Sequence, residues 1–405
     1  MRKRNFPALM LAAAVLLALP ACQASWQPDT PPEDTPEPPA RFEDAVEQFS
    51  ITSAAELLSG TENSCYSPVS AYFALAMAAA GASEETQAQL LALLGAEDTD
   101  TLAENCTALY GQLYCDEEQS KLYLANSIWT REDVVPREAY LTRLGDAFYA
   151  EQFSVPFGET QVNQQITDWV SERTQGLLEP EFSYEADTVA VLLNTIYFKD
   201  AWAEPFSEAR TERGFFTNAS GTAVEADFMH TGTVGAAYDG ETWKGASLPL
   251  ADGAEMFFLL PKEGQRLEAL LQEEGLQKLL AADSTGTYAI EWAVPKFSQS
   301  AERNLIPMLQ TLGVTDAFDP GLADFSQAFD AETPAYISAV RQGTSFTVDE
   351  AGVEAAAFTE VAMNESAAMP PEETLQMQLD RPFLYGVRSS SGTLLFIGVC
   401  ADPAV

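Results

Sequence analysis

The segment VAVLLNTIYF, residues 189–198, limits the possible folds of this chain more than any other feature. It is apolar except at Asn194 and Thr195, and it is rich in β-branched and aromatic residues. Such a run is typical of a β-strand that is covered on both faces. Asn194 then needs partners inside the sheet, because an unsatisfied buried amide costs about 1–3 kcal/mol. The segment therefore predicts a large sheet with a polar point in its interior.

The remaining hydrophobic patterns separate helices from strands along the chain. We expect helices over 43–59, from Ser67-Pro68 onwards (SAYFALAMAAAGA) and over 161–175. We expect strands over 256–261, 288–297 and 335–348, and a C-terminal hairpin in PFLYGVRSSSGTLLFIGV. Helices thus crowd the first half and strands the second. This order indicates an α+β fold with large antiparallel or mixed sheets.

A second buried amide is expected in the strand before Asp349. Counting by two, Gln342 shares one strand face with Thr344, Phe346 and Val348. Two interpretations of Asn194 and Gln342 are open. They cross-link neighbouring strands, or they belong to a seam at which the sheet opens.

The N-terminus predicts export. Basic residues at 2–4 and an apolar stretch at 9–19 precede Cys22, a pattern that resembles a bacterial lipoprotein signal. We expect a signal peptide at 1–21, lipidation of Cys22 and a Pro- and acid-rich tether at 22–41. Pro20 leaves a plain signal peptide as the alternative. Residues 42–405 form the globular domain, which we expect to be extracellular or anchored on the cell surface by lipid alone.

Composition excludes several classes of partner. The net charge of −40 argues against nucleic acid and against an anionic membrane surface. No metal site or cofactor is predicted, because the chain has no CxxC and only one histidine, His230. The four cysteines that follow the signal allow three full disulfide pairings, and the sequence does not choose among them: Cys65, Cys106, Cys115 and Cys400.

The segment Asp349–Ser366 stands where a surface loop is expected, yet it is small, apolar and suited to a strand. With period two, one face carries Val353, Ala355, Ala357 and Thr359. The other face carries Glu354, Ala356, Phe358 and Glu360. Because a buried charge is costly, the first, small and uncharged face is the one that can enter a sheet. The alternative is an ordinary Ala-rich loop.

The order of motifs resembles the serpin family from about residue 42 to the C-terminus. The motifs are NSCYSPVSAYFALAMAAAGASEETQAQL, LANSIW, WVSERTQGLL, LLNTIYFKDAW, FMHTG, VPKF, LGVTDAF, DEAGVEAAAFT and DRPFLYGVRSSSGTLLFIGV. The resemblance implies three β-sheets, eight or nine helices and an exposed reactive loop, here at about 350–376. In inhibitory members a serine protease attacks this loop, is trapped as an acyl-enzyme, and the cut loop inserts into the central sheet.

The resemblance also implies roles for individual residues. The hinge of the loop corresponds to Glu350, Gly352, Val353, Glu354, Ala355, Ala356, Ala357 and Thr359. The sheet-opening seam corresponds to Ser67, Ser70, Asn194, Trp202 and Gln342, where Gln342 replaces the family's usual histidine. The reactive bond falls at Ser366–Ala367 or at Glu365–Ser366. His230 matches a family histidine, and no catalytic role is expected for it.

The loop composition narrows the target. The chain carries no Lys or Arg between Gln342 and Asp380, so a trypsin-like protease has no side chain to bind. Small residues favour an elastase-like or subtilisin-like enzyme, while Glu365 suits a Glu-selective target and Met363 or Met369 a chymotrypsin-like one. We therefore expect a monomeric inhibitor rather than an enzyme. One alternative is a non-inhibitory serpin that acts as a binding or structural protein. A hydrolase is a third option, which the sequence supports poorly because it contains neither GxSxG nor HExxH.

Overall fold

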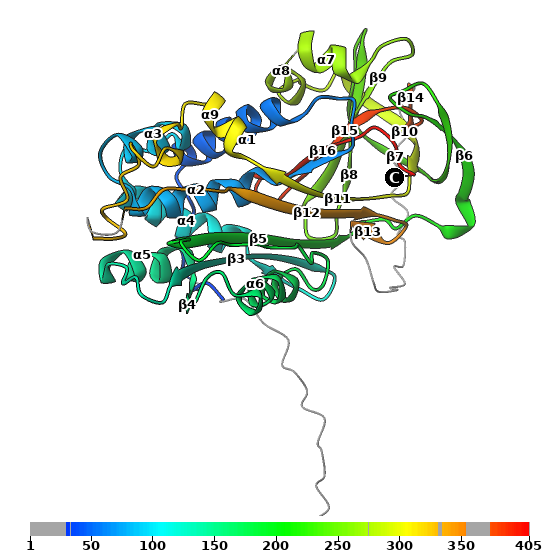
Figure 1. The fold of residues 1–405 in the computed structure, drawn as a ribbon. Helices are drawn as coiled ribbons and strands as arrows, with labels where there is room; N and C mark the ends of the chain where they lie inside the picture. The colour runs from blue at the N-terminus through cyan, green and yellow to red at the C-terminus, as the bar shows by residue number, and fades with distance from the viewer. Residues whose placement is uncertain (1–29, 33, 274, 331–333, 354–372, 405) are drawn as a thin grey trace, which may run out of the picture.

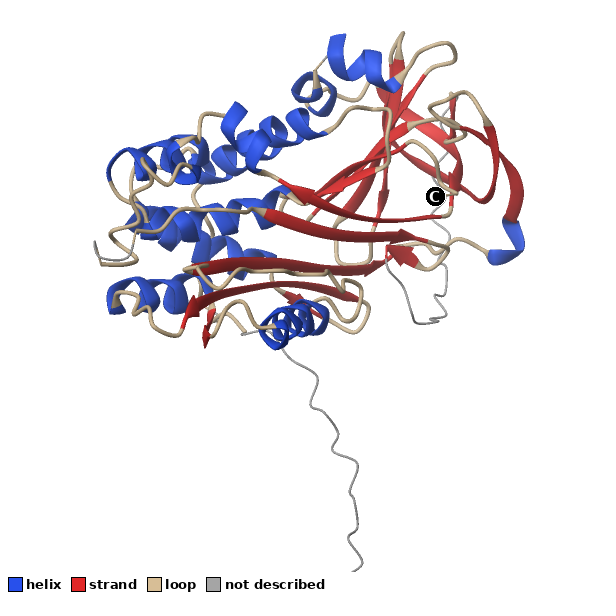
Figure 2. Cartoon of the chain, in the orientation of Figure 1, coloured by secondary structure: helices blue, strands red, loops and turns tan. Residues whose placement is uncertain are grey.

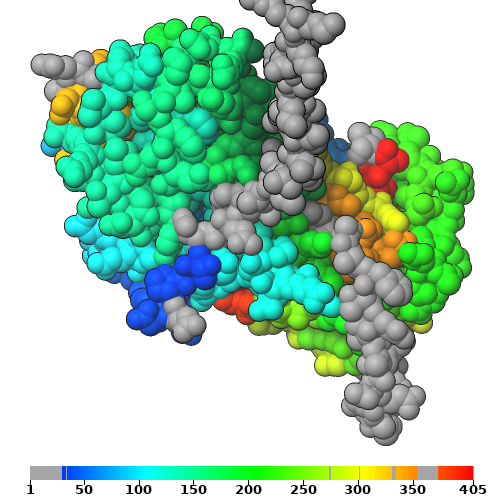
Figure 3. Space-filling model, turned by 90° about the horizontal axis from the view of Figure 1, so that it is seen from below, coloured from blue at the N-terminus to red at the C-terminus, as the bar shows by residue number. Residues whose placement is uncertain are grey.

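The computed structural model describes residues 30–32, 34–273, 275–330, 334–353 and 373–404. Most of the helices gather at one end of the molecule, and two sheets fill most of the rest (Figures 1 and 2). Seen from below, residues of the first half of the chain, in cyan and teal, cover one end, and strands of the second half lie at the other (Figure 3). The expected α+β architecture is confirmed.

The first sheet contains seven strands and holds the predicted buried strand near its centre. Its order is β11 (Phe297–Asn304), β12 (Arg341–Val348), β13 (Gly352–Val353), β5 (Ala190–Ala201), β3 (Ser120–Arg131) and β2 (Cys115–Asp116), with β4 (Glu151–Val155) beside β3. Helix α6 (Thr160–Arg173) packs on one face of β3 and β5, and the main core lies under the other. Covering on both faces explains why β5 is apolar from Ala190 to Phe198 except at Asn194 and Thr195.

The second sheet contains nine strands. Its order is β1 (Ser64–Tyr66), β16 (Leu394–Cys400), β15 (Phe383–Arg388), β9 (Glu255–Pro261), β8 (Trp243–Pro249), β7 (Ala223–Asp239), β10 (Gly286–Pro295) and β14 (Thr374–Gln378), with β6 (Thr211–Thr217) also on β7. The family resemblance implied three sheets, but hydrogen bonding joins the strands of the described residues into two. The reason is β7, whose 17 residues pair with β6 at one end and with β8 at the other.

Nine α-helices lie in the described residues. Besides α6 they are α1 (Ala40–Leu57), α2 (Pro68–Gly81), α3 (Glu84–Leu94), α4 (Thr99–Leu113), α5 (Glu138–Phe148), α7 (Leu267–Glu273), α8 (Leu276–Leu280) and α9 (Ile306–Thr311). The three predicted helices correspond to α1, α2 and α6. Helix α2 begins at Pro68, and the Ser67 side chain accepts a hydrogen bond from the Ser70 N–H. Almost every residue of α2 is buried.

Three details differ from the sequence-based expectations. The segment 335–348 is regular strand only from Arg341 onwards, because its ladder with β11 ends at the pair Asn304–Arg341. The predicted strand 288–297 divides at Pro295 into β10 and β11, which lie in different sheets. The end of the tether is not simply solvated, since Pro38 is buried and Thr35 packs closely against Gly111 of α4.

The four cysteines after residue 30 are free thiols, three of them buried. Within the part of the chain that the structure describes, no helix is long and apolar enough to cross a membrane.

Candidate functional site

The candidate site is a gap between β5 and β12 in the seven-stranded sheet. In the described residues these two strands are joined only through β13, where Val353 pairs with Val348 on one side and with Asp200 on the other. Beyond that point their facing edges share no ladder, and a cavity of about 130 Å³ opens between them. Residues 189–194 of β5 and 335–342 line its two sides, and α2 forms its floor.

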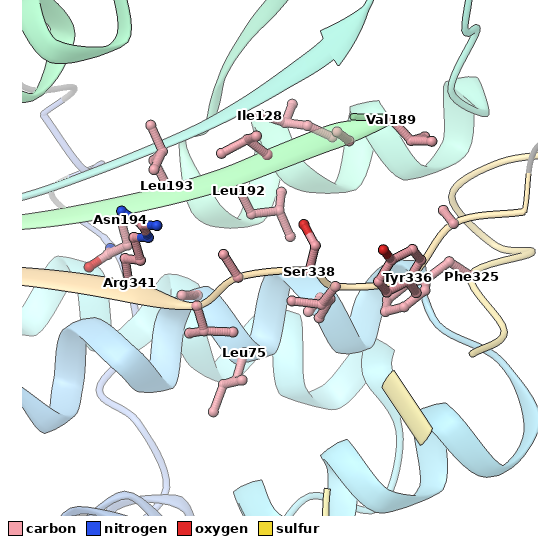
Figure 4. A pocket seen from close by; sticks show the side chains of 18 of the residues that line it. Leu75, Ile128, Val189, Leu192, Leu193, Asn194, Phe325, Tyr336, Ser338 and Arg341 are labelled. Atoms are coloured by element: carbon pink, nitrogen blue, oxygen red, sulfur yellow. The ribbon is translucent and has the colours of Figure 1, made fainter. Parts of the chain in front are cut away.

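The gap has apolar walls and free backbone on both sides. Figure 4 shows Leu192 from β5, Ser338 from the segment before β12 and Leu75 from α2 around the same space. The α2 residues beneath it are small, with Ala71, Ala74 and Ala78 among them. Within the described part of the chain no ladder joins the two facing edges, and such edges form a template for one more strand.

Asn194 is the centre of a hydrogen-bond chain on the β5 side of the gap. The Ser70 hydroxyl of α2 donates to Asn194 Oδ1, and Asn194 Nδ2 donates to Asn126 Oδ1 at 2.6 Å. Asn126 Nδ2 in turn donates to the Phe148 carbonyl oxygen at 2.7 Å. These hydrogen bonds connect β5 to β3 and to α2. Asn126 was not singled out from the sequence, although its place inside the apolar run LANSIW was an available signal.

Gln342 holds the other side of the gap to the start of α2. Its Oε1 accepts from the Ser67 N–H at 2.9 Å, and its Nε2 donates to the Ser67 carbonyl oxygen at 2.8 Å. The interpretation of both amides as strand cross-links therefore holds for Asn194 alone, because Gln342 binds a helix. Among the described residues, neither hydrogen-bond network crosses the gap. Serines 67 and 70, one turn apart on α2, are the shared support of both sides.

Trp202 fixes the chain just before the hinge. Its Nε1 donates to the Asp349 carbonyl oxygen at 2.8 Å, and its N–H donates to the Ala351 carbonyl oxygen at 3.0 Å. The indole is buried and meets Phe206 edge-on. The Phe206 N–H donates to the Glu350 carbonyl oxygen at 2.9 Å. Residues 349–351 are thereby held at the top of the gap.

The Glu350 side chain completes this clamp. Lys296 Nζ lies 2.7 Å from its Oε2, and the Thr211 hydroxyl donates to Oε1 at 2.8 Å. Partial burial opposes ionisation, but these two hydrogen bonds outweigh it and lower the pKa of Glu350. The hydrogen bond to Glu350 raises the pKa of Lys296. Lys296 was not predicted as a site residue, and its position in VPKF directly before β11 was the only signal for it.

Gly352 is the point of closest approach between the hinge and the sheet. A Cβ placed on it would lie 2.2 Å from the Asp200 carbonyl oxygen, so no other residue fits without a backbone shift. The next residue, Val353, is 1 % exposed and belongs to the main core. Its inward orientation agrees with the period-two pattern of the sequence.

Asp200 places a carboxyl group under the hinge. It is 1 % exposed, and the Ser120 hydroxyl donates to its Oδ1. Burial raises the pKa of Asp200 from 3.8 to about 6. The nearby Cys115 thiol is also affected, with burial raising its pKa to about 12. Asp200 was missed in the sequence, although a charge at the end of an apolar strand marks it.

Several predicted site residues cannot be placed. Glu354, Ala355, Ala356, Ala357, Thr359, Glu365, Ser366, Ala367 and Cys22 lie outside the described residues. His230 lies half-buried in β7 opposite Ala293, in the other sheet from the gap. The described site thus contains the seam, the first hinge residues and the clamp that holds them.

In the described residues, the seven-stranded sheet therefore has a gap between β5 and β12 that is bridged only by the two residues of β13. The model of the serpin (serine protease inhibitor) family matches residues 44–403. The chain is 30 % identical over 410 residues to alpha-1-antitrypsin 1-5 of Mus musculus, covering 98 % of this chain and 97 % of the relative. It is 29 % identical to the putative serpin-Z6C of Oryza sativa subsp. japonica, covering 86 % and 93 %.

Solved structures of serpins are also similar to this chain. Native tengpin, a thermophilic serpin, superposes with a TM-score of 0.81 at 28 % identity, over 93 % of this chain and 97 % of that one. Latent tengpin gives a TM-score of 0.77 at 28 % identity, over 90 % and 98 %. The chain therefore belongs to the serpin family, whose members are typically serine protease inhibitors.

Proposed function

We propose that this protein is a suicide-substrate inhibitor of extracellular serine proteases of the elastase-like or subtilisin-like kind. The single observation that carries the proposal is the gap between β5 and β12, which already holds Gly352 and Val353 as a two-residue strand at its upper end. The segment that continues from Val353 is the one with the small, uncharged face.

The energetics favour insertion after cleavage. Before cleavage, residues 353 and 373 are both tied to sheets, Val353 through β13 and the far end through β14. A cut between them releases that restraint and lets the segment fill the gap. Each new ladder hydrogen bond contributes about 0.5–1.5 kcal/mol, and the insertion also covers apolar walls. A protease still acylated by the loop would be carried along.

The choice of target rests on the loop alone. The absence of Lys and Arg from 342 to 380 removes trypsin-like enzymes, and the small residues around Ser366 and Ala367 suit shallow specificity pockets. The reactive bond is Ser366–Ala367 or Glu365–Ser366 in this proposal.

The test is to mix the purified protein, without its expected signal peptide, separately with an elastase-like enzyme, a subtilisin-like enzyme and trypsin. We expect a covalent adduct that survives denaturing electrophoresis with the first or second enzyme and none with trypsin. The intact mass of the released C-terminal peptide identifies the reactive bond. Clean cleavage by every enzyme, without an adduct and without a gain in thermal stability, would instead favour a non-inhibitory serpin.

The same proposal includes export and lipid attachment at Cys22, with the protein acting as a monomer at the bacterial cell surface. Metabolic labelling with a radioactive or alkyne fatty acid, in the parent and in Cys22→Ala, tests it. Label that persists in Cys22→Ala would contradict the anchor and leave a plain signal peptide.

A further inference from the structure

We propose that the Asp200 carboxyl group makes the docking of the hinge residues Gly352 and Val353 dependent on pH. When Asp200 is protonated, the two residues stay paired in the sheet, and when it ionises, they leave the sheet more readily. The pH dependence is a property of the uncleaved protein by itself. Its consequence for protease trapping rests on the proposed function.

Asp200 and Val353 stand side by side in one row of the seven-stranded sheet. Val353 pairs with Asp200 of β5 and with Val348 of β12. On its other side, Asp200 pairs with Ser120 of β3. Directly paired residues point to the same face of a sheet. Because Val353 belongs to the main core, the Asp200 carboxyl group also points inward, between Ser120 and Val353.

The main chain of Asp200 touches the hinge as well. Its carbonyl oxygen would lie 2.2 Å from a Cβ placed on Gly352. A shift of Asp200 in response to its own charge therefore reaches both hinge residues, Gly352 through the backbone and Val353 through the side chain.

Among the described residues, the Asp200 carboxyl group has few hydrogen-bond donors around it, and none of them is a cation. The Ser120 hydroxyl donates to Oδ1, and the Asp252 N–H donates to Oδ2 at 3.4 Å. The residue is 1 % exposed. A buried carboxylate with so few partners is costly, so the site favours the protonated form.

A second carboxyl group faces Asp200 from the turn between β8 and β9. Burial and, to a smaller extent, the charge of Asp252 raise the pKa of Asp200 to about 6. The Cys115 thiol of β2 lies against both carboxyl groups, and burial raises its pKa to about 12, so it stays neutral. Lys121 of β3 borders the same cavity of about 40 Å³, but its ammonium group is bound to Asp116. Ionisation of Asp200 thus adds a negative charge beside that of Asp252.

Release of the hinge brings water to the Asp200 carboxyl group. Val353 is 1 % exposed and covers the side of Asp200 that faces the gap. When Val353 leaves its row, the pKa of Asp200 returns toward the ordinary value of 3.8. The released state therefore binds the proton less tightly than the docked state. By linkage, acid stabilises the docked hinge and a higher pH favours its release.

The two pKa values of Asp200 determine the pH range of the effect. The equilibrium constant for release should rise as the pH passes from about 4 to about 6, and it should level off above that range. Between pH 5 and pH 7 the expected increase is up to about tenfold, a value that is reached when release exposes the carboxyl group fully.

Other titratable groups do not account for this range. Partial burial opposes the ionisation of Glu350, but hydrogen bonds from Lys296 and Thr211 lower its pKa, so Glu350 stays ionised from pH 5 to pH 7. His230, the only histidine of the chain, lies in β7 of the other sheet. A comparison between the parent and a variant of Asp200 cancels its contribution.

Hydrogen exchange of the uncleaved protein measures the release. The observable is deuterium uptake, by mass spectrometry, in peptides that contain residues 346–353 and 196–204. The parent is compared with Asp200→Asn at each pH, because intrinsic exchange chemistry is then common to both proteins. We expect the uptake rate of the parent, relative to Asp200→Asn, to rise up to about tenfold from pH 5 to pH 7 and to stay constant above it. A ratio that does not change with pH would overturn the proposal.

Two further substitutions should move the midpoint of this rise in opposite directions, each by roughly half a pH unit. Asp252→Asn removes the neighbouring negative charge, so the midpoint should fall. Ser120→Ala removes the hydroxyl that stabilises the carboxylate, so the midpoint should rise. Asp146→Asn, at an exposed position of α5, is the matched control and should keep the midpoint of the parent. Equal midpoints in all four proteins would show that Asp200 is not the titrating group.

This proposal and the proposed function fail separately. The exchange measurement contains no protease, so a constant ratio refutes the pH-dependent hinge even when the parent forms covalent adducts. A ratio that rises with pH, without an adduct to any enzyme, refutes the inhibitory function and leaves the pH-dependent hinge. Where both hold, release of Gly352 and Val353 lengthens the reactive loop at its first end. A protease should then attack the parent faster at neutral than at acid pH, relative to Asp200→Asn.

Discussion

The two sheets of this protein differ in how completely their strands are paired. In the nine-stranded sheet, neighbouring strands are hydrogen-bonded along an unbroken path from β1 to β14. In the seven-stranded sheet, β5 and β12 face each other across a cavity and are joined by two residues of β13. The nine-stranded sheet is therefore paired from edge to edge, whereas the seven-stranded sheet has, among the described residues, two facing strand edges in its interior that no ladder joins.

The comparison shows where the fold can form further hydrogen bonds, namely at the facing edges of β5 and β12. The free edges are not at the periphery, where a charge or a proline would protect them, but in the interior of a sheet. They are held apart by supports at both ends: the clamp of Trp202, Lys296 and Thr211 above, and the α2 serines below. The difference between the sheets is therefore a local one, and single residues can change it.

The largest effect is expected from a charge on the inward face of the hinge. Ala357→Arg should convert the protein from an inhibitor to a substrate, with covalent trapping reduced at least about a hundredfold, because insertion would bury an unpaired guanidinium at a cost of several kcal/mol. Ala356→Arg, on the outward face, is the matched control and should retain trapping. Adduct yield on denaturing gels checks both. Equal yields from the two variants would mean that the faces are assigned wrongly.

A smaller effect, on stability, is expected at Asp200. Because burial raises the pKa of Asp200 to about 6, its contribution to the free energy of unfolding is full below about pH 4 and is lost as the pH rises to about 6. Asp200→Asn should therefore be more stable than the parent at pH 7.5, by on the order of 2–3 kcal/mol, and equal to it near pH 4.

Urea denaturation at several pH values measures this difference. Ser120→Ala removes the hydroxyl that stabilises the carboxylate, so it should steepen the parent's loss of stability between pH 4 and 7. The same slope in the parent and in Asp200→Asn would contradict the assignment.

A comparable or smaller loss of stability is expected from a substitution of Gln342 in the seam. Gln342→Leu leaves the Ser67 N–H and carbonyl without their buried partners, which should cost about 1–3 kcal/mol in the uncleaved state. The same change should accelerate spontaneous opening of the gap. Thermal melting with and without a synthetic peptide of residues 353–363 would report both. Gln342→Glu should not rescue this loss at pH 7, because it keeps the acceptor for the Ser67 N–H but sets a buried carboxylate oxygen against the Ser67 carbonyl oxygen.

The smallest effect is expected at the half-exposed clamp. Glu350→Gln should cost roughly 0.5–1 kcal/mol at pH 7, since the Lys296 ammonium is partly in solvent. The pKa of Glu350 is lowered in the fold, so its contribution is present above its ordinary value of 4.5 and is lost as the pH falls through the folded pKa. The two proteins should therefore converge in acid. A difference that persists below pH 3 would show that the loss is steric.

Some features of the fold and of the candidate site could be predicted from the sequence alone. The apolar run at β5, the α2 start at Ser67-Pro68 and the inward face of Val353 follow from period and capping, which are local properties. The clamp does not, because Trp202, Lys296 and Glu350 come from three distant segments and meet only in the folded chain. The gap itself is a missing interaction, and no sequence pattern marks a hydrogen bond that is not made. The strand predicted over 335–348 was too long for a different reason, because β11 ends at Asn304 and leaves residues 335–340 without that neighbour.

The thiol of Cys65 can report on opening of the seven-stranded sheet. Cys65 lies in β1 beneath β12, where Thr344 Oγ1 donates to its carbonyl oxygen at 3.1 Å, and burial raises the pKa of its thiol to about 11. A closed protein should hide it from a maleimide reagent, since a buried neutral thiol reacts slowly. Any excursion that lifts β12 would expose it for a moment. The labelling rate of Cys65 thus measures how often the uncleaved protein opens transiently at β12.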